Sequence, residues 1–107
     1  MIKLWIEALR SGKYKQGFDR LMNTDGSCCA LGVACLVYEE HVKPLAREVS
    51  GIGICLDGKK FVLPEHVRVW LYGDNDNEIK VNVSYLNDVL KLTFAEIADI
   101  LEETYDT

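Results

Sequence analysis

The sequence lacks the features of membrane-spanning and secreted proteins. Its longest apolar run, Cys28 to Tyr38, falls well short of the roughly 20 residues that a helix needs to cross a bilayer. The N-terminal segment MIKLWIEALR has neither the long apolar core nor the cleavage site of a secretory signal. Internal repeats, low-complexity segments and linker-like stretches are absent as well. We therefore expect a single domain over residues 1–107, with no membrane partner, in the compartment where it is made.

Basic residues are fewer than acidic residues in this chain. The chain has 12 lysine and arginine residues against 17 aspartate and glutamate residues, which gives a net charge of −5. Because affinity for DNA comes mostly from basic side chains that neutralise phosphates, this balance argues against general nucleic-acid binding. The basic residues of the first twenty positions are Lys3, Arg10, Lys13, Lys15 and Arg20. This clustering permits a local anion site without a wholly basic face.

The spacing of metal ligands is also missing. Zinc sites usually draw on close Cys-x(2–4)-Cys pairs, whereas this chain has adjacent Cys28 and Cys29, then Cys35 and a distant Cys55. The acidic loop 74–78 begins like a calcium loop but lacks the glycine at the sixth position and the glutamate at the twelfth. We therefore expect no metal and no cofactor.

Few residues could support catalysis. The two histidines, His41 and His66, lie in charged contexts typical of an exposed helix surface. Free cysteine is among the most buried residue types, so we expect Cys29 and Cys35 to be core thiols and Cys28 to be partly exposed. A dyad of Cys29 with either histidine would make a small thiol-dependent enzyme, the least favoured of three functional alternatives.

The N-terminal half begins with a clear helical pattern. Apolar residues at i, i+3, i+4 and i+7 predict an amphipathic helix over residues 2–9 that ends at Ser11-Gly12. The segment 14–22 is predicted to be extended, and residues 23–26 (Asn-Thr-Asp-Gly) to form a turn. These two segments predict a short hairpin.

The middle of the chain predicts a buried helix followed by a hairpin. Residues 29–40 are apolar on almost every side, which is typical of a central helix, and Gly32 would let another element approach closely. We interpret residues 44–53 as a loop or a short helix. Asp57-Gly58 suits a two-residue type I′ turn, so residues 54–63 predict a hairpin.

The C-terminal half predicts further helices. Pro64 favours the start of a helix, and residues 79–83 alternate as in a short strand or the entry to a helix that Ser84 could cap. Thr93 and Glu96 form a capping box for the last helix. Together, the patterns predict a compact α+β domain in which about four helices pack on a small antiparallel sheet.

Four motifs carry a resemblance to a known group of proteins. They are ALRSG-x-Y-x-Q, Cys-Cys-x-Leu-Gly-Val-x-Cys, LNDV (86–89) and TFAEIADIL (93–101). The chain resembles small proteins of tailed bacteriophages that carry these motifs in this order. The resemblance covers nearly the whole chain and implies a protein of the bacterial host cytoplasm that modulates the host during infection. It is compatible with a sponge that sequesters a nucleotide immune signal and with an inhibitor that binds a host defence protein directly.

The candidate binding residues lie at breaks between the expected elements. Arg10 can bind a phosphate, Tyr14 can stack on a base, and Gln16 can pair with an amide or a base edge. Asn87 and Asp88 would be unusual inside a structural helix, although a turn or a cap that ties the last helix to the core explains them equally well. We therefore predict a site for a small anionic ligand at these five residues, in a protein that forms homo-oligomers.

Overall fold

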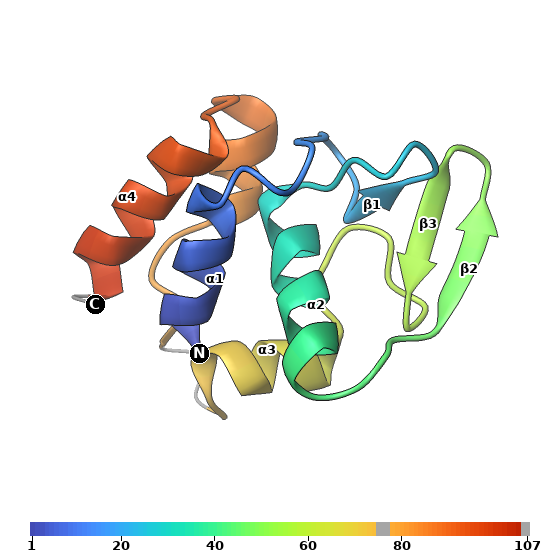
Figure 1. Cartoon of the computed structure of the whole chain (residues 1–107), viewed down its shortest axis with the longest axis horizontal. Coiled ribbons are helices and arrows are strands. Elements are labelled where there is room, and N and C mark those ends of the chain that lie inside the picture. The colour runs from blue at the N-terminus through green and yellow to red at the C-terminus, as the bar shows by residue number, and fades with distance from the viewer. Residues whose placement is uncertain (75–77, 106–107) are drawn as a thin grey trace.

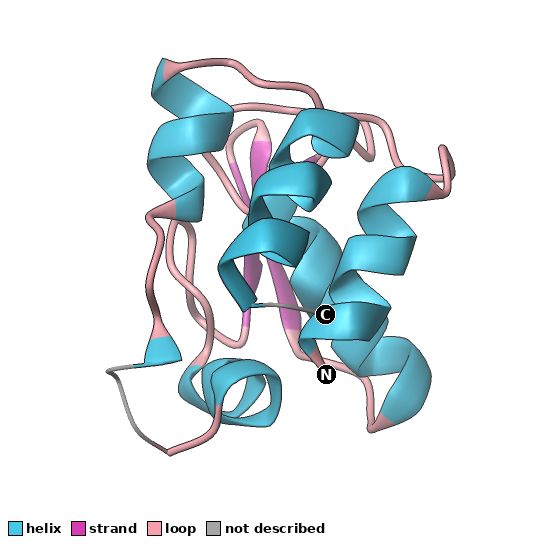
Figure 2. Ribbon diagram, turned by 90° about the vertical axis from the view of Figure 1, so that its left-hand side faces the viewer, coloured by secondary structure: helices cyan, strands magenta, loops and turns pink. Residues whose placement is uncertain are grey.

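The helices gather at one end of the molecule and the β-sheet lies at the other (Figure 1). The computed structural model describes residues 1–74 and 78–105. In chain order, the elements are α1 (Ile2–Arg10), β1 (Met22–Asn23), α2 (Ala30–His41), β2 (Arg47–Ser50), β3 (Gly53–Leu56), α3 (Glu65–Tyr72), the π-helix η2 (Tyr85–Val89) and α4 (Phe94–Tyr105). Seen from the side, the helices stand in front of the sheet (Figure 2). This architecture confirms the predicted α+β class.

The first helix forms as its apolar spacing predicts. α1 buries Ile2, Trp5, Ile6 and Leu9 on one face, between α2 and α4. Its C-cap is Ser11, and Gly12 follows with a φ of +76°, a conformation that other residues adopt at a cost.

The second helix, α2, occupies the centre of the fold. One apolar cluster joins it to α1 and α4, and a second cluster joins it to the sheet and α3. Close packing depends on Gly32, because a Cβ at that position would collide with the carbonyl oxygen of Leu21. Trp5 of α1 donates its indole N–H to the carbonyl oxygen of Ala30, 2.8 Å away. The predictions of a buried central helix and of close approach at Gly32 are confirmed.

The sheet is antiparallel, with the strand order β1-β3-β2. Two predictions were wrong here, because the segment 44–53 contains strand β2 and residues 59–63 are not a strand. The predicted turn does form, since Asp57 and Gly58 both have positive φ and Leu56 and Lys59 exchange two backbone hydrogen bonds. Beyond the turn only Lys59 pairs back with β3, because Ile54 and Gly53 are already paired with β1 on that side.

Of the two alternatives for residues 79–83, the structure has the second: the segment forms no strand and leads into η2. The predicted cap is wrong, because the side-chain oxygen of Asn82, rather than Ser84, accepts from the backbone N–H of Tyr85 at 3.1 Å. The capping box of α4 is confirmed by two hydrogen bonds between Thr93 and Glu96. The expected acidic loop lies partly outside the described residues. No helix in the described part of the chain is long and apolar enough to cross a membrane.

Candidate functional site

Three of the five predicted site residues meet at one point. The side-chain amide of Gln16 donates to the side-chain oxygen of Asn87 at 2.9 Å, and Asp88 accepts from the backbone N–H of Asp19 at 2.9 Å. Residues 16–19 are thereby held against η2, although about 70 positions separate them in sequence.

Asn87 is the centre of this cluster and is completely buried. Its oxygen accepts from Gln16 and from the backbone N–H of Ala30 at the start of α2, and its NH₂ group donates to Gly17 and Asp88. All four hydrogen-bonding positions of the amide are therefore satisfied within the protein. The structure supports the role of a cap that ties the C-terminal half to the core, and the capped helix is α2 rather than the last one.

Arg10 is the last residue of α1 and binds α4 instead of this cluster. Its guanidinium group contacts Asp99 at 2.6 Å and Glu102 at 2.8 Å, both on α4. The hydrogen bond from Arg10 to Glu102 lowers the pKa of the Glu102 carboxyl group. Arg10 therefore joins the first and last helices.

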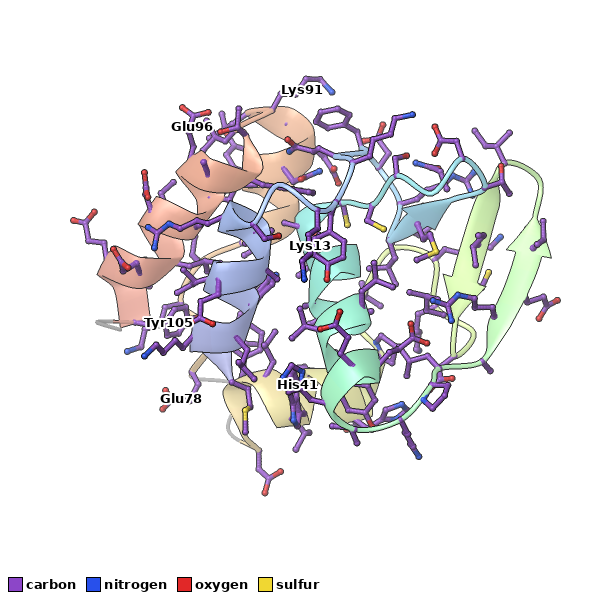
Figure 3. All side chains as sticks on the ribbon, viewed as in Figure 1. Lys13, His41, Glu78, Lys91, Glu96 and Tyr105 are labelled. Atoms are coloured by element: carbon purple, nitrogen blue, oxygen red, sulfur yellow. The ribbon has the colours of Figure 1, made fainter. Side chains whose placement is uncertain are left out.

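Tyr14 lies in a third place, in a hollow of about 310 Å³ between α1 and α2. Lys13 and His41, which Figure 3 labels, both line this hollow. Burial raises the pKa of Tyr14, and Glu40 beside it adds to the effect. The structure thus divides the predicted site among three locations, and ligand binding by these residues stays a prediction.

Gln16 also borders a polar hollow of about 590 Å³. Two basic side chains line it, but Lys15 is paired with Asp25 at 3.3 Å and Arg20 lies against Gly53. With one of its two cations paired and two carboxylates in its lining, Asp19 and Asp25, this hollow has no excess of positive charge to attract an anion.

The four cysteines are free thiols buried in the core. This confirms the expectation for Cys29 and Cys35 and corrects that for Cys28, which is only 1% exposed. Burial raises the pKa of Cys28 to about 11 and that of Cys29 to about 11. Because the thiolate is the reactive form, these groups are inert near neutral pH.

A further concave site is a mainly apolar groove that sequence reasoning missed. Its two walls are the segment 62–72, which includes most of α3, and the segment 79–84, and Leu31 of α2 also lines it. Its volume is about 460 Å³, within the usual range of ligand pockets. The groove is lined mainly by apolar side chains, namely those of Leu31, Val62, Leu63, Ile79, Val81 and Val83.

The charge of this groove is positive in a protein of net charge −5. Arg68 of α3 and Lys80 of the opposite wall both line it, and none of the described lining residues is acidic. Arg68 contacts Glu65 at 3.5 Å, a long ion pair to a carboxylate that is 83% exposed. The ammonium group of Lys80 lies over the ring of Tyr105, 5.8 Å from its centroid, at the exposed rim of the groove.

Aromatic residues support the groove. Tyr72 packs edge-on against Trp5, with ring centroids 6.2 Å apart, and also contacts Tyr105 of α4. Burial raises the pKa of Tyr72, so its hydroxyl keeps its proton and can donate a hydrogen bond. The Tyr105 hydroxyl accepts from the backbone N–H of Lys80 at 3.0 Å, which fixes the position of the wall.

One signal in the sequence could have indicated this site. Arg68 and Tyr72 are four residues apart on the predicted helix after Pro64, which places them on one face. The approach of Lys80 from another segment depends on tertiary structure. Among residues 1–74 and 78–105, no group of three or more potential metal ligands is present.

Comparisons with known proteins place the chain in a family. No curated protein and no solved structure matches it. The family model described as "Domain of unknown function (DUF8296)" matches residues 1–105, nearly the full length. The protein therefore belongs to the DUF8296 family.

Proposed function

We propose that this protein binds and sequesters a small anionic ligand, of the nucleotide class, in the groove between α3 and residues 79–84. The observation that carries the proposal is that Arg68 and Lys80 both line a mainly apolar groove whose described lining has no carboxylate. In a chain with an excess of acidic residues, such a local concentration of positive charge favours an anionic ligand.

The groove offers chemistry for both parts of a nucleotide. A guanidinium group such as that of Arg68 binds a phosphate through two parallel hydrogen bonds, in exchange for contacts within the protein that include the ion pair with Glu65. Lys80 adds a second charge, and the Tyr72 hydroxyl adds a neutral donor. The apolar walls suit the face of a base or another planar body.

Sequestration of a nucleotide signal requires binding but no catalysis. The phage-type sequence motifs support a protein that a tailed phage makes to modulate its bacterial host. A protein that removes a nucleotide signal needs affinity and abundance, and it needs no acid, base or nucleophile. The inert, buried thiols are compatible with this role.

The second candidate function is inhibition of a host defence protein by direct binding. It is favoured by apolar side chains that stand exposed in and next to the wall of the groove: Phe61 is 56% exposed and Val62 is 58% exposed. Exposed apolar residues of this size in one place are typical of protein contacts.

A thermal-shift screen separates the two candidates. Nucleotides, cyclic dinucleotides and ADP-ribose derivatives are each added at increasing concentration. At a hundredfold excess over Kd a ligand stabilises by about 2.7 kcal/mol, and each kcal/mol raises the melting temperature of a domain of this size by roughly 4–8 °C. We expect a shift of about 10 °C or more from the correct compound.

Variants locate the site. Arg68→Gln and Lys80→Gln should each weaken binding by at least about tenfold, because each removes a charge-assisted hydrogen bond. Lys43→Gln is the matched control, since it removes one exposed positive charge outside the groove. If no compound raises the melting temperature, the sequestration proposal is wrong, and inhibition of a host protein becomes the favoured function.

A further inference from the structure

Strand β2 is the open edge of the sheet. The strand order β1-β3-β2 leaves two edges, but the outer side of β1 is closed by residues 27–28, since the backbone N–H of Asn23 donates to the carbonyl oxygen of Ser27 at 2.8 Å. β2 has no strand on its outer side among the described residues, and Figure 1 shows it at the rim of the molecule.

The outward backbone groups of β2 can be identified. The backbone N–H of Asp57 donates to the carbonyl oxygen of Ala46 at 2.7 Å, so Ala46 faces β3. Because backbone groups alternate along an antiparallel strand, Glu48 and Ser50 also face β3, whereas Arg47 and Val49 face outward. Within the described residues, no backbone hydrogen bond reaches the outward N–H and C=O groups of these two residues.

The side chains of Arg47 and Val49, whose backbone groups face outward, do little to prevent pairing. Natural sheets protect their edges with free charges and proline, but the guanidinium group of Arg47 is held by both oxygens of Glu39, at 2.6 and 2.8 Å. Val49 is 68% exposed, and it shares a face with Ile54, its partner on β3, which packs against the core. A strand added here would extend an apolar surface that already exists.

We propose that a second copy of this chain pairs with β2 about a two-fold axis that passes beside Val49. The two Val49 residues would then exchange backbone hydrogen bonds, Arg47 would face Gly51, and Glu48 would face Ser50. A register centred on Glu48 also matches the outward groups, but it sets Glu48 opposite Glu48, and two like charges directly opposed destabilise a strand pair. The charge of Glu48 therefore disfavours that register relative to the one centred on Val49.

The product is a closed dimer with one continuous antiparallel sheet, to which each copy contributes three strands. Because the pairing uses the β2 edge of both copies, it ends at two. The proposal is independent of the groove, since none of the residues of β2 line it.

Sedimentation velocity at protein concentrations up to several hundred micromolar tests the pairing. Val49→Pro removes the outward N–H, and proline is tolerated at an edge position whose N–H does not belong to the sheet. Val49→Thr is the matched control, because it keeps the backbone N–H and the β-branched shape. We expect wild type and Val49→Thr to dimerise, and Val49→Pro to remain monomeric with a circular dichroism spectrum like that of wild type. A monomeric wild type, or a folded Val49→Pro that dimerises as wild type does, overturns the proposal.

A charge swap tests the register even if the proline variant does not fold. Ser50→Lys sets a lysine opposite Glu48 twice per dimer, and Ser50→Glu sets a second carboxylate there. Cross-strand pairs of this kind should tighten and weaken dimerisation, respectively, by about two- to thirtyfold, and less at high salt. If the two substitutions change the dissociation constant in the same direction, or leave it unchanged, the proposed dimer is wrong.

Discussion

The side-chain oxygen of Asn87 accepts a hydrogen bond from the backbone N–H of Ala30 at 3.2 Å, and this contact caps the N-terminus of α2 from a residue 57 positions away. The first N–H groups of a helix have no partner within the helix. α2 lacks a side-chain cap from its own N-cap residue, Cys29, so the π-helix supplies one. A polar residue inside η2 thus secures the central helix.

Replacement of Asn87 should be among the most damaging single changes. Asn87→Ala leaves the carbonyl oxygen of Gly17 and the backbone N–H of Ala30 without partners in a buried position, and each unsatisfied group costs about 1–3 kcal/mol. Gln16 loses one of its two hydrogen bonds and keeps the one to Leu92. We expect urea denaturation to show a loss of at least about 3 kcal/mol. Asn82→Ala is the matched control, because it removes an exposed cap worth about 1 kcal/mol. An equal loss in the two variants would contradict the role assigned to Asn87.

Arg10→Ala should lower the melting temperature in a pH-dependent way. The hydrogen bond from Arg10 lowers the pKa of Glu102 in the folded protein, so this pair stabilises the fold above the unfolded pKa of glutamate, near 4.3, and the contribution disappears as pH falls through the lowered value. Wild type should therefore be more stable than the variant at pH 7, and the difference should shrink on acidification. Lys13→Ala, which removes an exposed charge away from α4, is the control. A difference that does not change between pH 7 and pH 2 would refute the ion-pair explanation.

Thiol labelling of the native protein should be slow at neutral pH. Because burial raises the pKa of Cys28 and Cys29 to about 11, only about one thiol in ten thousand is ionised at pH 7. Labelling with a chromogenic disulfide reagent should accelerate in urea, where all four thiols become accessible. Rapid labelling of one cysteine in the folded protein would instead support the hypothesis of a thiol-dependent enzyme.

Gly32→Ala should destabilise the core through overpacking. The added methyl group would collide with the carbonyl oxygen of Leu21, a backbone atom that cannot move without shifting the chain around it. We expect a loss of about 3 kcal/mol or more in chemical denaturation, at or beyond the upper end of typical overpacking penalties. Gly12→Ala is a useful comparison, because a Cβ there meets open space and the penalty comes only from its positive φ.

The parts of the fold that were predictable are those with local signals. The apolar spacing of Ile2 to Leu9 and the capping box of Thr93 and Glu96 need only neighbouring residues, and both predictions are confirmed. Strand β2 was missed because its sequence, REVS, is short and mostly exposed, so it lacks the alternation that marks a half-buried strand. Its pairing depends on β3, which only the tertiary structure brings alongside.

The candidate site shows the same limit. Arg10, Tyr14 and Gln16 are close in sequence, but the chain turns at Gly12. As a result, Arg10 contacts α4, Tyr14 lies beside α2, and Gln16 bonds to η2. Arg68 and Lys80 come from separate segments, and their common groove exists only after the fold has formed. Proximity along the chain was a poor guide to proximity in space.

The retention of a ligand is the measurement that tests the account most directly. The protein is purified from phage-infected bacteria and examined by native mass spectrometry, beside the Arg68→Gln/Lys80→Gln double variant expressed in the same way. We predict that wild type carries an additional mass that denaturation releases as a phosphate-bearing small molecule, and that the double variant has lost it. A wild-type protein without bound ligand, or a double variant that retains the same ligand, would contradict sequestration in the groove.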